Sequence, residues 1–149
     1  MLKEGDPFPE FSLQDQDGNV VTNKDLRDRK TVVYFYPKDD TPGCTGEACE
    51  FRDLSPAYPG AKVIGVSPDS PKSHTKFIGK FGLNFPLLAD VDHHLAEECG
   101  IWVEKSMYGK TYMGVERTTY LLDEDGAISK IWRKVKPEGH AEAVAEALA

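Results

Sequence analysis

Two cysteines five residues apart, Cys44 and Cys49, are the side chains of this chain best suited to carry out chemistry. Cys44 follows an apolar run over residues 31–36 and ends the segment 41–44, in which Thr41 occupies the position of a helix N-cap. The first turn of a helix carries unpaired N–H groups and a partial positive charge, which favour a thiolate over a thiol. Cys44 is therefore a candidate nucleophile, and Cys49 is a candidate partner in redox chemistry.

The spacing of the two cysteines limits how they can react with each other. In a regular helix, residues five apart are rotated by about 140° and their Cα atoms lie roughly 8.6 Å apart. A disulfide needs Cα atoms within about 7 Å of each other. A bond between Cys44 and Cys49 would therefore require at least one helical turn to unwind. The alternative that Cys49 is a passive helix residue is also compatible with this spacing.

Two other cysteine chemistries fit the sequence less well. A C-x-x-C dithiol motif is absent, because Thr41 and Glu47 occupy the positions that would complete it. An iron–sulfur pattern would need a third cysteine at position 52, which is Arg52. His93 and His94 are adjacent, point to different sides of a helix, and are interpreted as surface residues rather than metal ligands. We therefore expect no bound metal.

Arg117 is the next candidate, because it directly precedes the apolar segment 118–122. A guanidinium this close to a core needs an anionic or polar partner. Beside Cys44 it would stabilise a thiolate and could bind an oxygen-rich substrate. Alternatively, it pairs with Glu116, Asp53 or another acid and has only a structural role.

The composition is that of an ordinary globular protein of 149 residues, and we expect one domain over residues 1–149. The net charge of −7 argues against nucleic acid or an anionic membrane as a partner, and the densest basic stretch, 27–30, is interrupted by an acid. The N-terminus has no apolar signal region, and no apolar run reaches membrane-spanning length. Three cysteines are an odd number for a secreted disulfide framework, so we expect a cytoplasmic protein.

Apolar periodicity and turn residues predict an α/β fold with a mixed central sheet flanked by helices and an N-terminal β-hairpin. This element order fits a thioredoxin-like architecture. The polar stretch 105–114 is interpreted as a loop. The predicted elements are a hairpin over 11–21, strands at 31–36, 63–67 and 85–89, helices at 42–58, 71–81, 92–99 and 140–148, and a second hairpin of strands 118–122 and 127–132.

The combined motifs resemble the peroxiredoxins, and within them the bacterioferritin comigratory protein (PrxQ) group. The family pattern Pro-x-x-x-Thr/Ser-x-x-Cys is present from Pro37 to Cys44. The extension typical of the group, TPGCT-x-x-AC, is present as residues 41–49. The later segment 104–117, which ends on Arg117, is similar to the loop and arginine strand of that group. The resemblance extends from about residue 5 to the last helix.

This resemblance implies a thiol peroxidase of antioxidant defence that reduces hydrogen peroxide and organic hydroperoxides to water and alcohols. Cys44 would be the peroxidatic cysteine that becomes a sulfenic acid, and Cys49 the resolving cysteine that forms a disulfide with it. Thr41, Arg117 and the Cys44 N–H would stabilise the charge that moves onto the leaving oxygen, and Pro37 would shield the thiol. The resemblance also implies a thioredoxin-like dithiol reductant, and no metal, haem or flavin.

Some questions stay open at this stage. Cys99 lies outside the matched motif and is interpreted as incidental, although a Cys44–Cys99 or intermolecular bridge is an alternative. Glu47 places a carboxylate one turn after Cys44, where it opposes thiolate formation unless another group binds it. We expect a monomer rather than a dimer. Alternative functions are a disulfide reductase or isomerase, which the missing C-x-x-C disfavours, and a non-enzymatic binding or holdase domain with Cys44 as a redox sensor.

Overall fold

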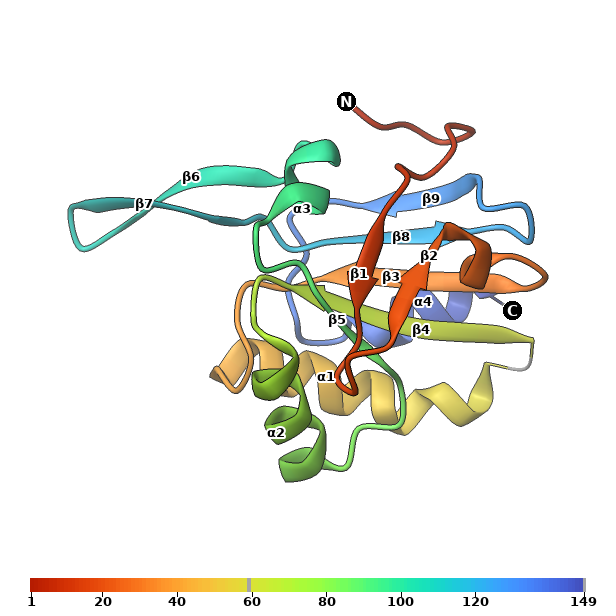
Figure 1. The fold of residues 1–149 in the computed structure, drawn as a ribbon, viewed down its shortest axis with the longest axis horizontal. Coiled ribbons are helices and arrows are strands. Elements are labelled where there is room, and N and C mark those ends of the chain that lie inside the picture. The colour runs from red at the N-terminus through yellow and green to blue at the C-terminus, as the bar shows by residue number, and fades with distance from the viewer. Residues whose placement is uncertain (59, 149) are drawn as a thin grey trace.

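A seven-stranded mixed β-sheet forms the centre of the computed structural model, which describes residues 1–58 and 60–148 (Figure 1). The strands lie in the order β2-β1-β5-β4-β3-β8-β9. The central strands β3, β4 and β5 are parallel, and the strands on either side of them pair antiparallel. The bounds of the strands are Ser12–Gln14 (β1), Val20–Thr22 (β2), Lys30–Phe35 (β3), Ala61–Ser67 (β4), Leu87–Ala89 (β5), Thr118–Leu122 (β8) and Ile128–Trp132 (β9).

Strand β3 leads directly into the segment that carries Cys44. Its sequence is apolar along its length because both of its faces are covered. Successive side chains of a strand point to opposite faces, so Val32 and Tyr34 pack on one side of the sheet and Val33 and Phe35 on the other. Pairing with β4 on one side and β8 on the other fixes the end of β3 and the start of the loop that follows.

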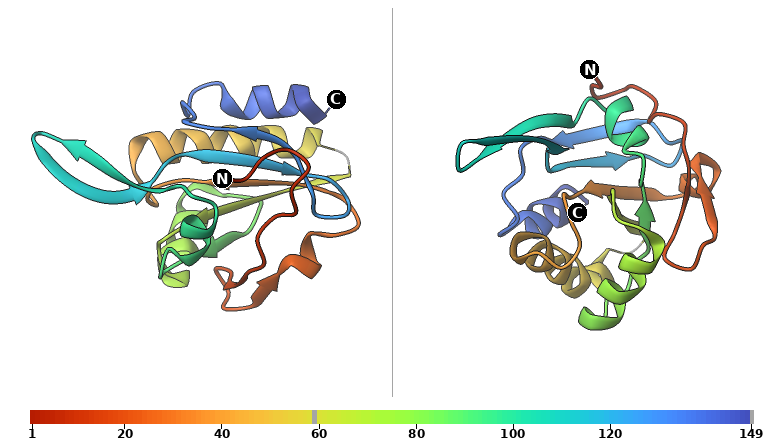
Figure 2. Two further views of the ribbon diagram at one scale, coloured as in Figure 1. Left: turned by 90° about the horizontal axis from the view of Figure 1, so that it is seen from above. Right: turned by 60° about the vertical axis from the view of Figure 1, so that its left-hand side comes forward.

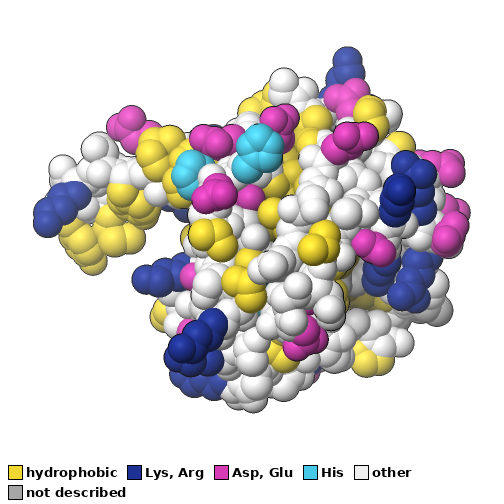
Figure 3. Space-filling view, in the orientation of Figure 1, with side chains coloured by type: hydrophobic (Ala, Val, Ile, Leu, Met, Phe, Trp, Pro, Cys, Tyr) yellow, Lys and Arg dark blue, Asp and Glu magenta, His cyan; other side chains and the backbone are white. Residues whose placement is uncertain are grey.

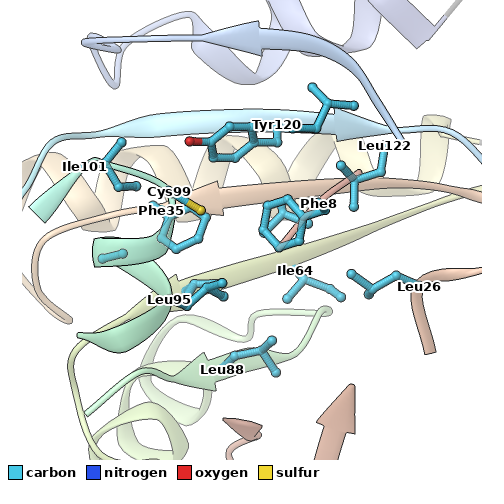
Figure 4. Packing of buried hydrophobic residues seen from close by; sticks show 14 of the residues in the cluster. Phe8, Leu26, Phe35, Ile64, Leu88, Leu95, Cys99, Ile101, Tyr120 and Leu122 are labelled. Carbon is cyan, nitrogen blue, oxygen red and sulfur yellow. The ribbon is translucent and has the colours of Figure 1, made fainter. Parts of the chain in front are cut away.

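Helices cover the two faces of the sheet unequally (Figure 2). Helices α1 (Pro42–Leu54), α2 (Pro71–Phe81) and α4 (His140–Leu148) contribute to the core on the Tyr34 side, and α1 lies beside α4. Helix α3 (His94–Glu98) and the N-terminal segment cover the opposite face. Figure 4 shows the core on that face, where Phe8, Phe35 and Tyr120 pack as an aromatic group.

The start of α1 differs from the prediction in the role of Thr41. Thr41 has the extended backbone of an N-cap and Pro42 takes the first helical position, as expected, but the Thr41 side chain does not cap the helix. Its hydroxyl instead donates a hydrogen bond to the Lys38 carbonyl at 2.9 Å. Helix α1 ends at Leu54, and a 3₁₀ turn over Ser55–Ala57 follows where the prediction continued the helix to residue 58. Pro59, expected to end the helix, lies outside the described residues.

The prediction of a loop over 105–114 is wrong. Strands β6 (Trp102–Met107) and β7 (Lys110–Val115) pair antiparallel in a separate two-stranded hairpin that projects from the body of the protein (Figure 1). Tyr108 and Gly109 connect the strands, both with positive φ, of 52° and 78°. The hairpin was hidden from the sequence because most of it is exposed on both faces, so its residues show no alternation of apolar and polar side chains.

The other predicted elements are present. The N-terminal hairpin pairs β1 with β2, and β8 pairs with β9 in the second hairpin. Ser70 caps the start of helix α2 with a side chain that accepts from the Ser73 N–H, and Gly82, with φ of 60°, caps its end. The mixed sheet, the flanking helices and the N-terminal hairpin confirm the predicted fold class. Within residues 1–58 and 60–148, no helix is long and apolar enough to cross a membrane.

Candidate active site

Cys44 is the third residue of α1 and lines a cavity of about 450 Å³. Its side chain is 2% exposed and packs in the core beside β3. Thr41 and Pro37, both predicted as site residues, line the same cavity. The turn from β3 into α1 therefore brings Pro37, Thr41 and Cys44 together at one cavity.

Arg117, which is 73 residues further along the chain than Cys44, completes this group. It directly precedes β8, which lies next to β3 in the sheet, so its side chain reaches the start of α1. Arg117 Nη2 donates to Cys44 Sγ at 3.3 Å, and Nη1 donates to Glu47 Oε1 at 2.6 Å. The sequence left open whether Arg117 contacts the Cys44 thiol or pairs with an acid. It does both, and the acid is Glu47.

Burial dominates the electrostatics of Glu47. Its side chain is 0% exposed, and burial raises its pKa to about 7, although the Arg117 guanidinium acts to lower it. Its second carboxylate oxygen has no hydrogen-bond partner among the described residues. Glu47 is therefore bound by Arg117 through one oxygen, which answers how a carboxylate can lie so close to Cys44.

Arg117 itself stays charged in this environment. Burial acts to lower its pKa, but the Glu47 carboxylate and Cys44 raise it above its usual value. One permanently cationic group therefore lies between two groups that can each be anionic. Such an arrangement stabilises negative charge on sulfur and on any oxygen that binds beside it.

The hydroxyl of Thr41 has a defined hydrogen-bonding direction. Because its proton is donated to the Lys38 carbonyl, its lone pairs are left to accept a hydrogen bond. Thr45 is the first residue of α1 whose N–H bonds back along the chain, to the Thr41 carbonyl. The N–H of Cys44 precedes it and has no acceptor within the helix, so it can bind an oxygen atom of a ligand.

Cys49 is partly buried and lies on the same uninterrupted helix as Cys44. Both thiols are free, as the geometry of an intact helix requires, because their Cα atoms would be roughly 8.6 Å apart. Both cysteines therefore lie in one continuous helix, as assumed from their spacing. A bond between them needs the first turns of α1 to open.

Cys99 is remote from this group. It follows α3, is 1% exposed, and packs in the core on the opposite face of the sheet from Cys44 (Figure 4). Burial raises the pKa of its thiol to about 12. The sheet separates the two sulfur atoms, so the arrangement disfavours the alternative of a Cys44–Cys99 bridge within one molecule.

The β6–β7 hairpin forms one wall of the cavity. It was not predicted from the sequence that these residues line the site. Trp102, Met107 and Met113 line it with apolar surface, and Lys105 contributes an ammonium group. Figure 3 shows hydrophobic side chains gathered along the projecting hairpin. The sequence signal was the two-residue turn ending in Gly109, a common hairpin connection.

The two adjacent histidines lie in different surroundings. His93 stacks on the Trp102 ring with centroids 4.0 Å apart, and His94 is exposed. In the part of the chain that the structure describes, no group of three histidine, cysteine or acidic side chains is arranged to hold a metal ion.

The fold and the site together define a thioredoxin-like thiol enzyme, in which one cysteine lies at the start of a helix and contacts an arginine. Residues 4–131 match the model of the AhpC/TSA family. The chain is 48% identical to peroxiredoxin Bcp of Bacillus subtilis and 46% identical to that of Escherichia coli, covering 99% and 96% of this chain and 93% of each relative. The chain belongs to the AhpC/TSA family, and within it to the Bcp/PrxQ peroxiredoxins, which makes it a thiol peroxidase.

Solved structures agree with this assignment. A mutant of PrxQ from Xylella fastidiosa superposes with a TM-score of 0.93 at 38% identity, covering 99% of this chain and 96% of that one. The bacterioferritin comigratory protein of Xanthomonas campestris superposes with a TM-score of 0.87 at 45% identity, covering 93% of this chain and 89% of that one. These matches confirm the thioredoxin-like fold predicted from the order of elements.

Proposed function

We propose that Cys44 is the peroxidatic cysteine of this thiol peroxidase, with Thr41, Arg117 and Pro37 forming its substrate site. The single observation that carries the proposal is the 3.3 Å contact from Arg117 Nη2 to Cys44 Sγ beside a cavity that both residues line. A guanidinium in this position stabilises the thiolate and does so before substrate arrives.

In the first step, the Cys44 thiolate attacks the terminal oxygen of a hydroperoxide. A sulfur–oxygen bond forms, the oxygen–oxygen bond breaks, and the remaining alkoxide or hydroxide leaves and takes up a proton from solvent. Cys44 becomes a sulfenic acid, and the substrate is reduced to an alcohol or water. Arg117 and the Cys44 N–H donate to the oxygens as charge develops on them, and Thr41 accepts from the substrate O–H.

In the second step, Cys49 resolves the sulfenic acid. The Cys49 thiolate attacks the Cys44 sulfur, the sulfur–sulfur bond forms, the sulfur–oxygen bond breaks, and the sulfenic oxygen leaves as hydroxide, which takes up a proton from solvent to become water. Because both residues belong to α1, the first turns of the helix open before this bond can form. A dithiol reductant such as thioredoxin then reduces the disulfide by exchange, and its own dithiol is oxidised.

We propose that organic hydroperoxides are substrates as well as hydrogen peroxide. The apolar wall of Trp102, Met107 and Met113 beside Cys44 supports this, because it offers an alkyl group a surface to bury. The relative from Xanthomonas campestris is described as having alkyl peroxide reduction activity.

We further propose that residues 1–149 act as a single domain, as a monomer, in the cytoplasm. The shared sheet that joins the N-terminal hairpin to β9 supports one domain. Three free cysteines suit a reducing compartment, in which a dithiol reductant is available. Sedimentation of the reduced and the oxidised protein tests the monomer, and a stable dimer of either form contradicts it.

Peroxide consumption coupled to thioredoxin, its reductase and NADPH tests the enzymatic proposal. Cys44→Ser is expected to abolish consumption. Cys49→Ser is expected to keep a single turnover of Cys44 oxidation but to block cycling with thioredoxin. Cys99→Ser is the matched control and keeps both. Full activity of Cys44→Ser contradicts the assignment of the nucleophile, and cycling by Cys49→Ser contradicts that of the resolving thiol.

A further inference from the structure

The peptide group between Lys38 and Asp39 links a polar cluster outside the cavity to the hydroxyl of Thr41. The carbonyl oxygen of this peptide accepts from Thr41 Oγ1 at 2.9 Å. Its N–H, that of Asp39, donates to Asp69 Oδ2 at 2.8 Å. A peptide group is planar and resists twisting, so holding the N–H also fixes the direction of the carbonyl. The orientation of the Thr41 hydroxyl therefore depends on Asp69.

The carboxylate of Asp39 holds the same loop from a second side. Its Oδ1 accepts from the Tyr36 hydroxyl at 2.5 Å, and its Oδ2 accepts from Ser73 Oγ at 2.8 Å. His74 Nδ1 lies 2.8 Å from the same Oδ2. Ser73 and His74 belong to α2, so this side chain ties the loop before α1 to a neighbouring helix.

His74 contacts the Asp39 carboxylate in the interior of the protein. Its Nε2 lies 2.9 Å from the Leu88 carbonyl, which can only accept, so Nε2 carries a proton. Its Nδ1 faces Asp39, which also accepts from two hydroxyls. The side chains of His74 and Asp39 are only 0% and 3% exposed, so neither is satisfied by water if the other is removed.

We propose that Asp39 and Asp69 are positioning residues for the peroxide reaction. They hold the Lys38–Asp39 peptide so that the Lys38 carbonyl takes the proton of Thr41 Oγ1. The lone pairs of that hydroxyl then face the cavity above Cys44 and accept from the substrate O–H. Neither carboxylate is among the described residues that line the cavity, so both act through Thr41. The inference rests on the proposed roles of Cys44 and Thr41.

Single-turnover oxidation of the reduced protein by tert-butyl hydroperoxide tests the proposal. Asp39→Ala and Asp69→Ala are expected to lower the second-order rate constant by about 10- to 100-fold, because small displacements of a positioning group have effects of this size. Adding Thr41→Val to either aspartate variant should lower the rate constant much less than it does in the wild-type protein, because the Thr41 hydroxyl is already misdirected in those variants. A merely structural role would lower the midpoint of urea unfolding and leave the rate of the folded protein and the effect of Thr41→Val unchanged. That result would overturn the proposal.

Asp40→Asn is the matched control. The Asp40 carboxylate joins the same loop to the same helix through Lys80 at 2.9 Å, but on the surface. Asparagine tolerates the positive φ of 56° at this position, and an exposed pair contributes little, so the rate should stay within about twofold of wild type. A loss as large as that of Asp39→Ala would overturn the proposal, because the loss of any contact between this loop and α2 would then slow the reaction.

Milder variants keep the test decisive if the alanine variants do not fold. Asp39→Asn preserves the shape of the side chain, and Ser73→Ala removes one of its donors; each is expected to lower the rate about two- to tenfold. Wild-type rates in both folded variants would overturn the proposal. Cys44→Ser separates the two levels of inference. If it still consumes peroxide, the proposed function fails; if it is inactive while the Asp39 and Asp69 variants react normally, only the positioning role fails.

Discussion

Glu47 lies one helical turn after Cys44, and a single guanidinium contacts both side chains. Arg117 donates to Glu47 at 2.6 Å and to the Cys44 sulfur at 3.3 Å. The carboxyl group of Glu47 and the sulfur of Cys44 therefore share one cation.

Arg117→Lys should slow Cys44 oxidation by about 100-fold or more, the usual cost of losing a donor aimed at a developing charge. A lysine ammonium is a point charge and does not reproduce the planar fork that reaches both partners. Stopped-flow oxidation by hydrogen peroxide measures the rate. Arg133→Lys, at an exposed position, is the control and should react like wild type. A wild-type rate for Arg117→Lys would contradict the role of the guanidinium.

Glu47→Gln should remove a pH dependence of stability. The pKa of Glu47 is raised to about 7 in the folded protein by burial, from an ordinary value of 4.5. Between these values the folded state binds a proton that the unfolded state has released, so stability is full at low pH and is lost as pH rises toward 7. The loss is on the order of 2–3 kcal/mol. Because other groups titrate in the same window, the measure is the difference between wild type and Glu47→Gln, which keeps a carbonyl acceptor for Arg117. Urea unfolding should show the variant gaining stability relative to the wild type as pH rises from 4.5 to about 7. An identical slope in both proteins would contradict the assignment.

His140 should give the opposite slope. Burial, and secondarily Arg117, lower its pKa from 6.5 to about 4, and its Nε2 lies 2.7 Å from Thr119 Oγ1. The unfolded state takes up a proton first as pH falls, so stability is lost between pH 6.5 and about 4, on the order of 2–3 kcal/mol. Because the Glu47 slope opposes this one, the effect is measured as a difference: the stability of His140→Gln relative to the wild type should rise as pH falls from 6.5 to about 4, whereas that of His94→Gln, at an exposed site, should not. A difference that does not change with pH in His140→Gln would contradict the assignment.

The sequence predicted the elements whose physical signal is local. The turn from β3 into α1 was readable because Pro42 suits a helix start and the strand before it is buried on both faces. Arg117 was found because a cation beside an apolar strand needs a partner. That partner could not be identified, since Glu47 is 70 residues away and only the pairing of β3 with β8 brings them together.

Two other features were out of reach for different reasons. The β6–β7 hairpin is paired only with itself and exposed on both faces, so no buried face imposes the alternation by which strands are recognised. The cluster of Asp39, Asp69 and His74 joins residues that are about 30 positions apart. In the sequence, these polar residues cannot be distinguished from exposed ones. Burial distinguishes them, and burial is a property of the packed molecule.

Cys99 should be unreactive in the folded protein. Burial raises the pKa of its thiol to about 12, so almost none is thiolate at neutral pH. Iodoacetamide at pH 8 should label Cys49 and Cys44 before Cys99, and labelling of Cys99 should appear only in urea. Peptide mapping of the peroxide-treated protein should find a Cys44–Cys49 disulfide. A bridge to Cys99 would contradict both the burial argument and the separation of the thiols by the sheet.

Oxidation should open the first turns of α1 and leave its second half intact. Two contacts anchor the second half of α1 and the turn after it to the start of α4: the N–H of Gly139, just before α4, donates to Glu50 Oε1 at 2.9 Å, and the Tyr58 hydroxyl donates to the Ala141 carbonyl at 3.0 Å. Phe51 is 0% exposed and holds the helix against the sheet. Unwinding is therefore least costly between the helix start and Cys49, where these anchors are absent.

Amide hydrogen exchange of the reduced and the disulfide-bonded protein measures this directly. We expect faster exchange over residues 44–50 after oxidation and little change over 51–58, because local opening exposes only the amides that lose their helical bonds. Peroxide-treated Cys49→Ser is the control: it can form the sulfenic acid but no disulfide, so its helix should stay protected. If a mapped Cys44–Cys49 disulfide coexists with unchanged protection at 44–50, the two thiols meet without unwinding. If fast exchange spreads past Phe51, the anchors to α4 do not confine the opening, and the whole helix must re-form in each catalytic cycle.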